Sequence, residues 1–137
     1  MQLRHYVVIH DCGHVINPKI VDGQITGGVV HGVGNALFEE MIYDASGQPV
    51  STNLGEYLLP TATEIPQIRI GHIETPSPLN PLGIKGAGES GTIPAIAAII
   101  AAVENALAPF GVVVERYPLN PERVVDMIDA ARARNDA

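Results

Sequence analysis

One segment decides how this sequence is interpreted, namely Leu82-Gly-Ile-Lys-Gly-Ala-Gly-Glu-Ser-Gly-Thr-Ile-Pro94. It combines several glycines with one lysine and one carboxylate, and it ends where a strongly apolar stretch begins. We expect Thr92 to cap the helix that follows, with Pro94 in its first turn. The glycines allow a close backbone approach, and a helix start favours an anion. Because Glu89 would repel an anion, the combination favours catalysis over simple phosphate binding.

Two other interpretations of this segment stay open from local features. The run Gly86-Ala-Gly-Glu-Ser-Gly91 matches the dinucleotide pattern G-x-G-x-x-G, but that pattern should follow an apolar strand. Here Pro76, Pro78 and Pro81 precede it instead, so a nucleotide-binding module is disfavoured. The simpler alternative is a glycine-rich turn that leads into a core helix.

The composition predicts a globular protein with one domain over residues 1–137. The 137 residues are 46% hydrophobic and 17% charged, which suits a modest core. Fifteen acidic against eight basic residues, a net charge of −7, argue against a nucleic-acid partner. A single cysteine fits a reducing compartment, and we expect the cytoplasm. The sequence shows no signal-peptide pattern, and we expect no apolar run long enough for membrane insertion.

Short β-rich runs predict three strands, over residues 6–10, 67–73 and 112–115. The first run begins almost at Met1, so we expect that strand to lack a neighbour. Asp44-Ala-Ser-Gly47 predicts the turn of a hairpin.

Three helices are predicted, over residues 17–37, 95–107 and 120–134. The first and last begin at Asn-Pro, a cap followed by a first-turn proline. The first also repeats apolar residues every fourth position, and the second is apolar nearly all round, so we expect it to be buried on most sides. The predicted fold class is therefore α+β, with a small mixed sheet, two main packed helices and a C-terminal helix.

The first predicted helix is unusually rich in glycine. Each glycine in a helix interior costs up to about 1 kcal/mol relative to alanine. Close approach by a neighbouring backbone or by a cofactor would explain the excess, and both alternatives remain open for Gly23, Gly27, Gly28, Gly32 and Gly34. His31, on the same helix, either faces a ligand or fills a glycine-lined gap.

The run His10-Asp-Cys-Gly-His14 brings metal-binding side chains close together in the sequence. A zinc site needs a second ligand cluster at suitable spacing, and neither His31 nor His72 forms one. A strand that ends in a turn is the preferred interpretation, and no metal ligand is predicted.

Several motifs together resemble the molybdopterin-binding large subunit of the xanthine dehydrogenase, aldehyde oxidase and aerobic carbon monoxide dehydrogenase-like family. They occur in the family's order along nearly the whole chain: Asp11-Cys-Gly-His-Val-Ile-Asn-Pro18, Gly23-Gln-Ile-Thr-Gly-Gly-Val-Val-His-Gly-Val-Gly34 with Ala36-Leu-Phe-Glu-Glu40, Tyr57-Leu-Leu-Pro60, Ile65-Pro66 and Lys85-Gly-Ala-Gly-Glu89. One departure is His31, where the family more often has glutamine. The resemblance implies a C-terminal portion of a larger molybdenum-cofactor-binding domain, present here as a split subunit or a fragment.

The resemblance also implies a function. The chain would belong to a molybdenum hydroxylase that oxidises an aldehyde, an N-heterocycle or a similar small substrate, with water as the oxygen source and Glu89 as general base. The residues expected at the molybdopterin, for which the cytosine dinucleotide form is one option, are Lys85, Gly86, Ala87, Gly88, Gly28 and His31. The remaining cofactor-binding chain, iron–sulfur clusters and FAD are expected in partner subunits. A non-catalytic assembly subunit of such a complex is the alternative.

Overall fold

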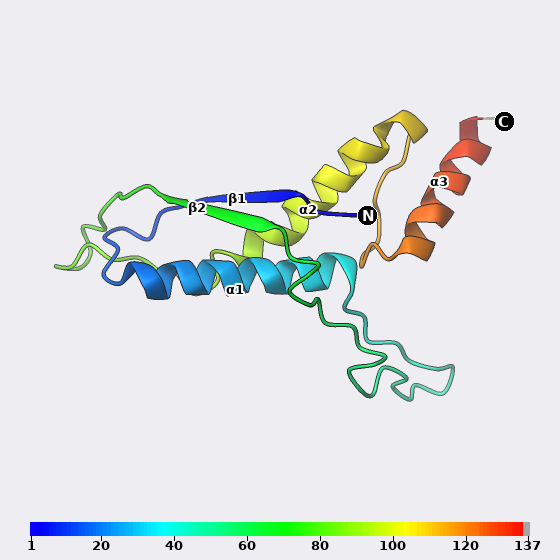
Figure 1. The fold of residues 1–137 in the computed structure, drawn as a ribbon, viewed down its shortest axis with the longest axis horizontal. Coiled ribbons are helices and arrows are strands. Elements are labelled where there is room, and N and C mark those ends of the chain that lie inside the picture. The colour runs from blue at the N-terminus through cyan, green and yellow to red at the C-terminus, as the bar shows by residue number, and fades with distance from the viewer. Residues whose placement is uncertain (136–137) are drawn as a thin grey trace. The chain divides into compact units, whose positions relative to one another are not determined.

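The computed structural model describes residues 1–135 and shows an α+β protein (Figure 1). In chain order its elements are β1 (His5–His10), α1 (Pro18–Leu37), β2 (Gln67–His72), α2 (Thr92–Leu107), a 3-10 turn η1 (Ala108–Phe110) and α3 (Pro121–Asn135). The predicted fold class is confirmed.

The chain divides into two compact units. One, here called the sheet unit, contains Gln2–Gly32 and Thr61–Ala95; the other, the α3 unit, contains Met1, Val33–Pro60 and residues 96–135. Both α1 and α2 therefore contribute residues to each unit. A single domain over 1–137 stays a prediction.

In the sheet unit, β1 and β2 pair in parallel, with His5 opposite Gln67 and His10 opposite His72. Figure 1 shows the two arrows side by side. The expectation that the first strand lacks a neighbour was therefore wrong, because its partner is supplied by a strand more than fifty residues further along the chain. Antiparallel contacts are limited to two isolated bridges, Gly13 with Ile84 and Tyr43 with Pro49.

Helix α1 begins as its sequence predicts. The Asn17 Oδ1 accepts a hydrogen bond from the Ile20 amide at 3.3 Å, and Pro18 is the first helical residue. The predicted apolar stripe is also present: Ile25, Val29 and Val33 are fully buried. These three side chains are among the largest that are fully buried within residues 1–135.

Helix α2 differs from its prediction in two ways. It begins at Thr92 itself, and the Thr92 and Ile93 amides both donate to the Glu89 carbonyl at 3.1 Å, so the cap lies before Thr92. Only one stripe of the helix is buried, formed by Ala95, Ile99 and Val103, whereas Ile93 is 71% exposed. The expectation of burial on most sides was wrong, because no described segment covers the remaining faces.

By length and composition alone, the 19-residue stretch Thr92–Phe110, with a mean hydropathy of 1.7, is sufficient to cross a membrane. The expectation that no apolar run reaches this length was therefore wrong. The core helix of a soluble protein has the same features, so they do not assign the helix to a membrane.

In the α3 unit, α3 is capped by Asn120, whose Oδ1 accepts from the Arg123 amide at 2.8 Å. The Leu119 amide donates to the Ala36 carbonyl at 2.7 Å, and Leu119 is 2% exposed. The predicted hairpin is a turn closed by the Val50 amide on the Ile42 carbonyl at 2.7 Å. The predicted strand at 112–115 is absent; that segment is irregular, and the Val114 amide bonds the Glu104 carboxylate at 3.1 Å.

Candidate functional site

An open hollow of about 300 Å³ lies in the sheet unit between α1 and the start of α2. It brings together three of the residues predicted from the sequence: Gly28, His31 and Gly88. The remaining lining residues are Gly23, Gln24, Gly27 and Thr92. For Gly23 and Gly27 the sequence left packing and cofactor approach open, whereas Gln24 and Thr92 were not predicted as site residues. A signal for the glycines was present in the sequence, since Gly23, Gly27 and His31 recur every fourth residue and so share one face of a helix.

Glu89 immediately follows Gly88, on the turn that precedes α2. Its side chain is exposed, and within residues 1–135 no hydrogen bond or ion pair engages its carboxylate. The start of a helix carries a partial positive charge that favours a nearby carboxylate. The fold thus leaves a free acidic side chain one residue away from the wall of the hollow.

The glycines of α1 divide into two groups with different environments. A Cβ at Gly28 would lie 2.8 Å from the Thr92 nitrogen, and a Cβ at Gly32 would lie 2.3 Å from the Ala95 Cβ. A Cβ added at Gly23 or Gly27 would have no neighbouring atom within 4 Å. Packing therefore explains Gly28 and Gly32, whereas Gly23 and Gly27 leave open space along the hollow.

Gly91, just before α2, also packs closely against the backbone of α1. A Cβ at Gly91 would lie 2.2 Å from the Ile25 carbonyl oxygen and 3.0 Å from the Val29 nitrogen. No side chain fits there without movement of the backbone. The contact fixes the end of the Lys85–Gly91 loop against α1.

Lys85, Gly86 and Ala87 are not among the residues that line the hollow. The Lys85 Nζ donates to the Asp11 Oδ2 at 3.0 Å and to the Thr75 Oγ1 at 2.5 Å, and the Lys85 amide donates to the Cys12 carbonyl at 2.8 Å. These contacts support a loop-orienting role for Lys85. A Cβ at Gly86 or Gly88 would meet nothing within 4 Å, so backbone there is open to approach.

Asp11 is the polar centre of this region. Its carboxylate accepts hydrogen bonds from the Thr75 hydroxyl, from the Gly13 and Thr75 amides at 2.9 and 3.2 Å, and from Lys85. The Thr75 hydroxyl, followed by the Gly13 amide, holds the pKa of Asp11 well below its usual value. The carboxylate therefore stays ionised across the neutral and mildly acidic range.

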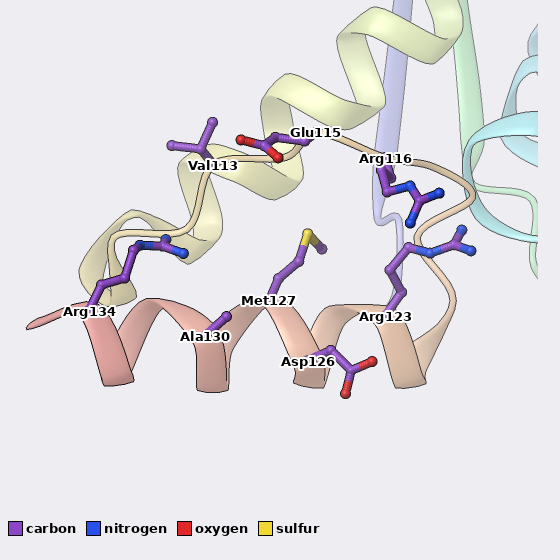
Figure 2. A pocket seen from close by; sticks show the side chains of 8 residues that line it. All are labelled: Val113, Glu115, Arg116, Arg123, Asp126, Met127, Ala130 and Arg134. Carbon is purple, nitrogen blue, oxygen red and sulfur yellow. The ribbon is translucent and has the colours of Figure 1, made fainter.

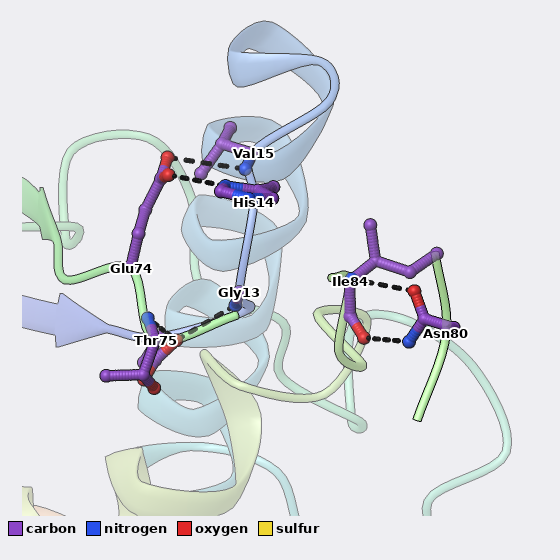
Figure 3. A network of polar contacts seen from close by, with 8 residues as sticks. Gly13, His14, Val15, Glu74, Thr75, Asn80 and Ile84 are labelled. Carbon is purple, nitrogen blue, oxygen red and sulfur yellow. Dashed lines mark hydrogen bonds and ion pairs between the residues drawn. The ribbon is translucent and has the colours of Figure 1, made fainter. Parts of the chain in front are cut away.

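Neighbouring contacts hold the same segments (Figure 3). Glu74 accepts from the Val15 amide at 3.4 Å and lies 3.0 Å from the His14 Nδ1, and the hydrogen bond from His14 is the main reason that the pKa of Glu74 is lowered. Asn80 bonds both the amide and the carbonyl of Ile84, at 3.1 and 2.9 Å. Glu74 thus ties the turn after β1 to the segment after β2, and Asn80 closes a turn in the loop before Lys85.

The His10–His14 run does not assemble a metal centre. Over the part of the chain that the structure describes, no group of three or more His, Cys, Asp or Glu side chains could hold a metal ion. The His10 and His72 rings meet edge to face at 6.2 Å, and the His72 Nε2 lies 2.8 Å from the Asp22 Oδ1. Cys12 is buried and free.

The dinucleotide interpretation of Gly86–Gly91 also fails on structure. The pattern requires a strand immediately before the loop, whereas β2 ends at His72 and the segment up to Lys85 holds only the isolated bridge at Ile84.

The α3 unit has a hollow of its own, of about 610 Å³ (Figure 2). Its walls come from residues 113–116 and from α3, and they include Met127, Arg116 and Arg134. Arg123, also in the wall, bonds the Glu40 carboxylate at 3.0 Å and the Pro118 carbonyl at 2.6 Å. None of the predicted site residues lies here.

Sequence and structure comparisons place this fold among known enzymes. Residues 1–66 match the molybdopterin cofactor-binding domain. The chain is 50% identical over 117 residues to the nicotine 6-hydroxylase large subunit of Paenarthrobacter nicotinovorans, covering 85% of this chain. It is 42% identical over 119 residues to the xanthine dehydrogenase molybdenum-binding subunit of Escherichia coli O157:H7, covering 86%. The chain belongs to this molybdopterin-binding family.

The fold agrees with that assignment. The crystal structure of quinoline 2-oxidoreductase from Pseudomonas putida 86 superposes with a TM-score of 0.91 at 52% identity over 93% of this chain. The chain spans 14% of the length of the nicotine 6-hydroxylase subunit, 15% of the xanthine dehydrogenase subunit and 16% of the quinoline enzyme's chain. It therefore corresponds to a small part of a much larger molybdopterin-binding subunit.

Proposed function

We propose that the chain is part of a molybdenum hydroxylase that oxidises an aldehyde, an N-heterocycle or a similar small substrate, with water as the oxygen source and Glu89 as the general base. One observation carries the proposal. Glu89 is exposed and unengaged within residues 1–135, on the turn that opens α2 and next to the glycine-lined hollow.

The residues at the hollow fit the approach of a large cofactor. A side chain at Gly23, Gly27 or Gly88 would project into space that is open in this chain, so their backbone can contact a bulky group without steric conflict. Gln24 and His31 add hydrogen-bonding side chains to the same wall. When bound, the molybdenum cofactor would supply the redox centre, and its metal would lower the pKa of the water that provides the oxygen.

Glu89 supplies what a general base requires. A base must come within hydrogen-bonding distance of the proton that it removes. The Glu89 carbonyl accepts the Thr92 and Ile93 amides, so the start of α2 holds the Glu89 backbone from one side, while the carboxylate remains free to accept a proton.

The rest of the enzyme is assigned to partner chains. The hollow has one wall built from α1 and the start of α2, and the remaining molybdopterin-binding chain would complete it. Iron–sulfur clusters are held by several cysteine thiolates, whereas this sequence has only Cys12, so we assign the clusters to partner subunits. We assign the FAD to partner subunits as well. We also propose a cytoplasmic complex, and a free cysteine is compatible with that reducing compartment. The cytosine dinucleotide form of the pterin belongs to the same proposal.

Glu89→Gln in the assembled enzyme tests the base. The amide keeps the shape of the side chain but cannot accept the proton, so kcat should fall by about 10²–10⁴-fold, while molybdenum measured by mass spectrometry stays at the wild-type level. Glu122→Gln is a matched control, because Glu122 is also an exposed acid near a helix start, in the first turn of α3. Its kcat should be unchanged.

Two results would contradict the assignment. Near-normal turnover of Glu89→Gln with molybdenum intact would leave the chain as a non-catalytic assembly subunit. Parallel loss of molybdenum and activity would make Glu89 a structural residue.

A further inference from the structure

The loop that carries Glu89 is held at its two ends and free between them. At its start, the Lys85 amide donates to the Cys12 carbonyl at 2.8 Å and the Lys85 ammonium reaches Asp11. At its end, Gly91 packs against the backbone of α1. Between these points, Gly86–Gly88 makes no hydrogen bond to any other residue in the range 1–135. The position of Glu89 is therefore set by the two ends.

Asp11 controls the first of these ends. Its carboxylate joins three segments that are far apart in the sequence: the turn after β1 through Gly13, the segment after β2 through Thr75, and the loop through Lys85. The side chains of Asp11 and Lys85 are 30% and 38% exposed, so the pair is partly shielded from water. The lowered pKa of Asp11 keeps its carboxylate ionised at the pH of any ordinary assay.

We propose that Asp11 is a positioning residue for Glu89. Through its contact with the Lys85 ammonium, Asp11 holds the start of the Lys85–Gly91 loop, which carries Glu89. This inference rests on the proposed role of Glu89 as general base. Gly86 and Gly88 give the intervening backbone more freedom than any other residue would. Without the ammonium contact, only backbone contacts of Ile84 and Lys85 hold the start of the loop, and movement of Gly86–Gly88 would shift the Glu89 side chain. A displacement of about 1 Å at a reacting group lowers a rate by about 10²-fold.

The fold does not depend on this one contact. The Gly83 carbonyl accepts the His14 amide at 3.2 Å. Glu74 bonds His14 and Val15, and Asn80 bonds the amide and the carbonyl of Ile84 (Figure 3). The His14 and Glu74 contacts join the same segments without Asp11, and the Asn80 contacts hold the turn before Lys85. Loss of the Asp11–Lys85 pair should therefore alter the loop more than the fold, and cofactor content should separate the two effects.

A double-mutant cycle in the assembled holoenzyme tests the inference. Asp11→Asn should lower kcat by about 10–100-fold, with KM and molybdenum content near wild type. In a Glu89→Gln background the same substitution should lower kcat by less than about 2-fold, because residues that act through one another are not additive. Lys85→Met, which leaves the three other donors to Asp11 in place, should behave as Asp11→Asn does.

Asp44→Asn is the matched control. Asp44 also accepts several loop hydrogen bonds, from Ser46 and Gln48, but it lies in the α3 unit. Its kcat should be unchanged.

Three outcomes would overturn the positioning role. If Asp11→Asn lowers kcat equally in both backgrounds, Asp11 acts independently of Glu89. If kcat is unchanged while Glu89→Gln is impaired, the pair has no effect on the base, although the proposed function stands. If Asp11→Asn and Lys85→Met both lose molybdenum, the pair is structural. Full activity of Glu89→Gln alone would instead refute the proposed function itself.

Discussion

Adjacent glycines on α1 should respond in opposite ways to the same substitution. A Cβ at Gly28 would lie 2.8 Å from the Thr92 nitrogen and 2.9 Å from the Gly91 Cα, both of which are backbone atoms that cannot rotate away. A Cβ at Gly27 would meet nothing within 4 Å. Each alanine gains the same helix propensity, up to about 1 kcal/mol, so this gain cancels when the two variants are compared.

The remaining difference is overpacking, which typically costs about 1–3 kcal/mol. Gly28→Ala should therefore have a free energy of unfolding about 1–3 kcal/mol below that of Gly27→Ala. Urea unfolding followed by far-ultraviolet circular dichroism measures the difference, provided that both variants show the same denaturant dependence. Gly32→Ala against Gly23→Ala is an independent pair with the same expected sign, since a Cβ at Gly32 would lie 2.3 Å from the Ala95 Cβ.

Equal stabilities within about 0.5 kcal/mol, the range of ordinary surface substitutions, would refute the reasoning. Gly28 would then not be in close backbone contact with the start of α2. A Gly28→Ala variant more stable than Gly27→Ala would refute the predicted overpacking more strongly.

Two further predictions concern the cofactor and acid stability. The chain purified alone should hold no stoichiometric molybdenum by mass spectrometry, because it provides only one wall of the hollow. Co-expression with the remaining molybdopterin-binding chain should restore the metal. Stoichiometric metal on the isolated chain would show that the site is not shared. The folded-state pKa of Asp11 lies below the ordinary 3.8, so the stability that its carboxylate contributes is present above pH 3.8 and is lost as the pH falls further. The midpoint urea concentration should therefore drop more between about pH 4 and pH 2 in the wild type than in Asp11→Asn. Identical profiles would contradict the lowered pKa of Asp11.

The starts of the helices were predictable because their caps act locally, whereas the pairing of strands distant in the sequence was not. Asn17 and Asn120 act within three residues of themselves, so the sequence alone reveals their capping role. The pairing of β1 with β2 joins His5 to Gln67, and no local pattern encodes such a partner. The segment Val112–Glu115 has the composition of a strand, but propensity does not provide a neighbouring strand.

The candidate site follows the same division. Glu89 and Gly88 were identifiable because they belong to one short motif. The Asp11–Lys85 pair spans 74 positions, and its members looked unrelated in the sequence. Gly27 and Gly28 are adjacent and chemically identical, so composition could not distinguish the open position from the packed one; only the placement of Thr92 does so.

The single buried stripe of α2 has a consequence for how the protein can be produced. Its other faces present alanine and isoleucine side chains to solvent, with Ile93 71% exposed. Apolar surface of this kind promotes association between copies. Because encounters between copies rise with the square of their concentration, slow synthesis at low temperature should yield more dispersed protein than rapid overproduction, even when the stability of each molecule is the same.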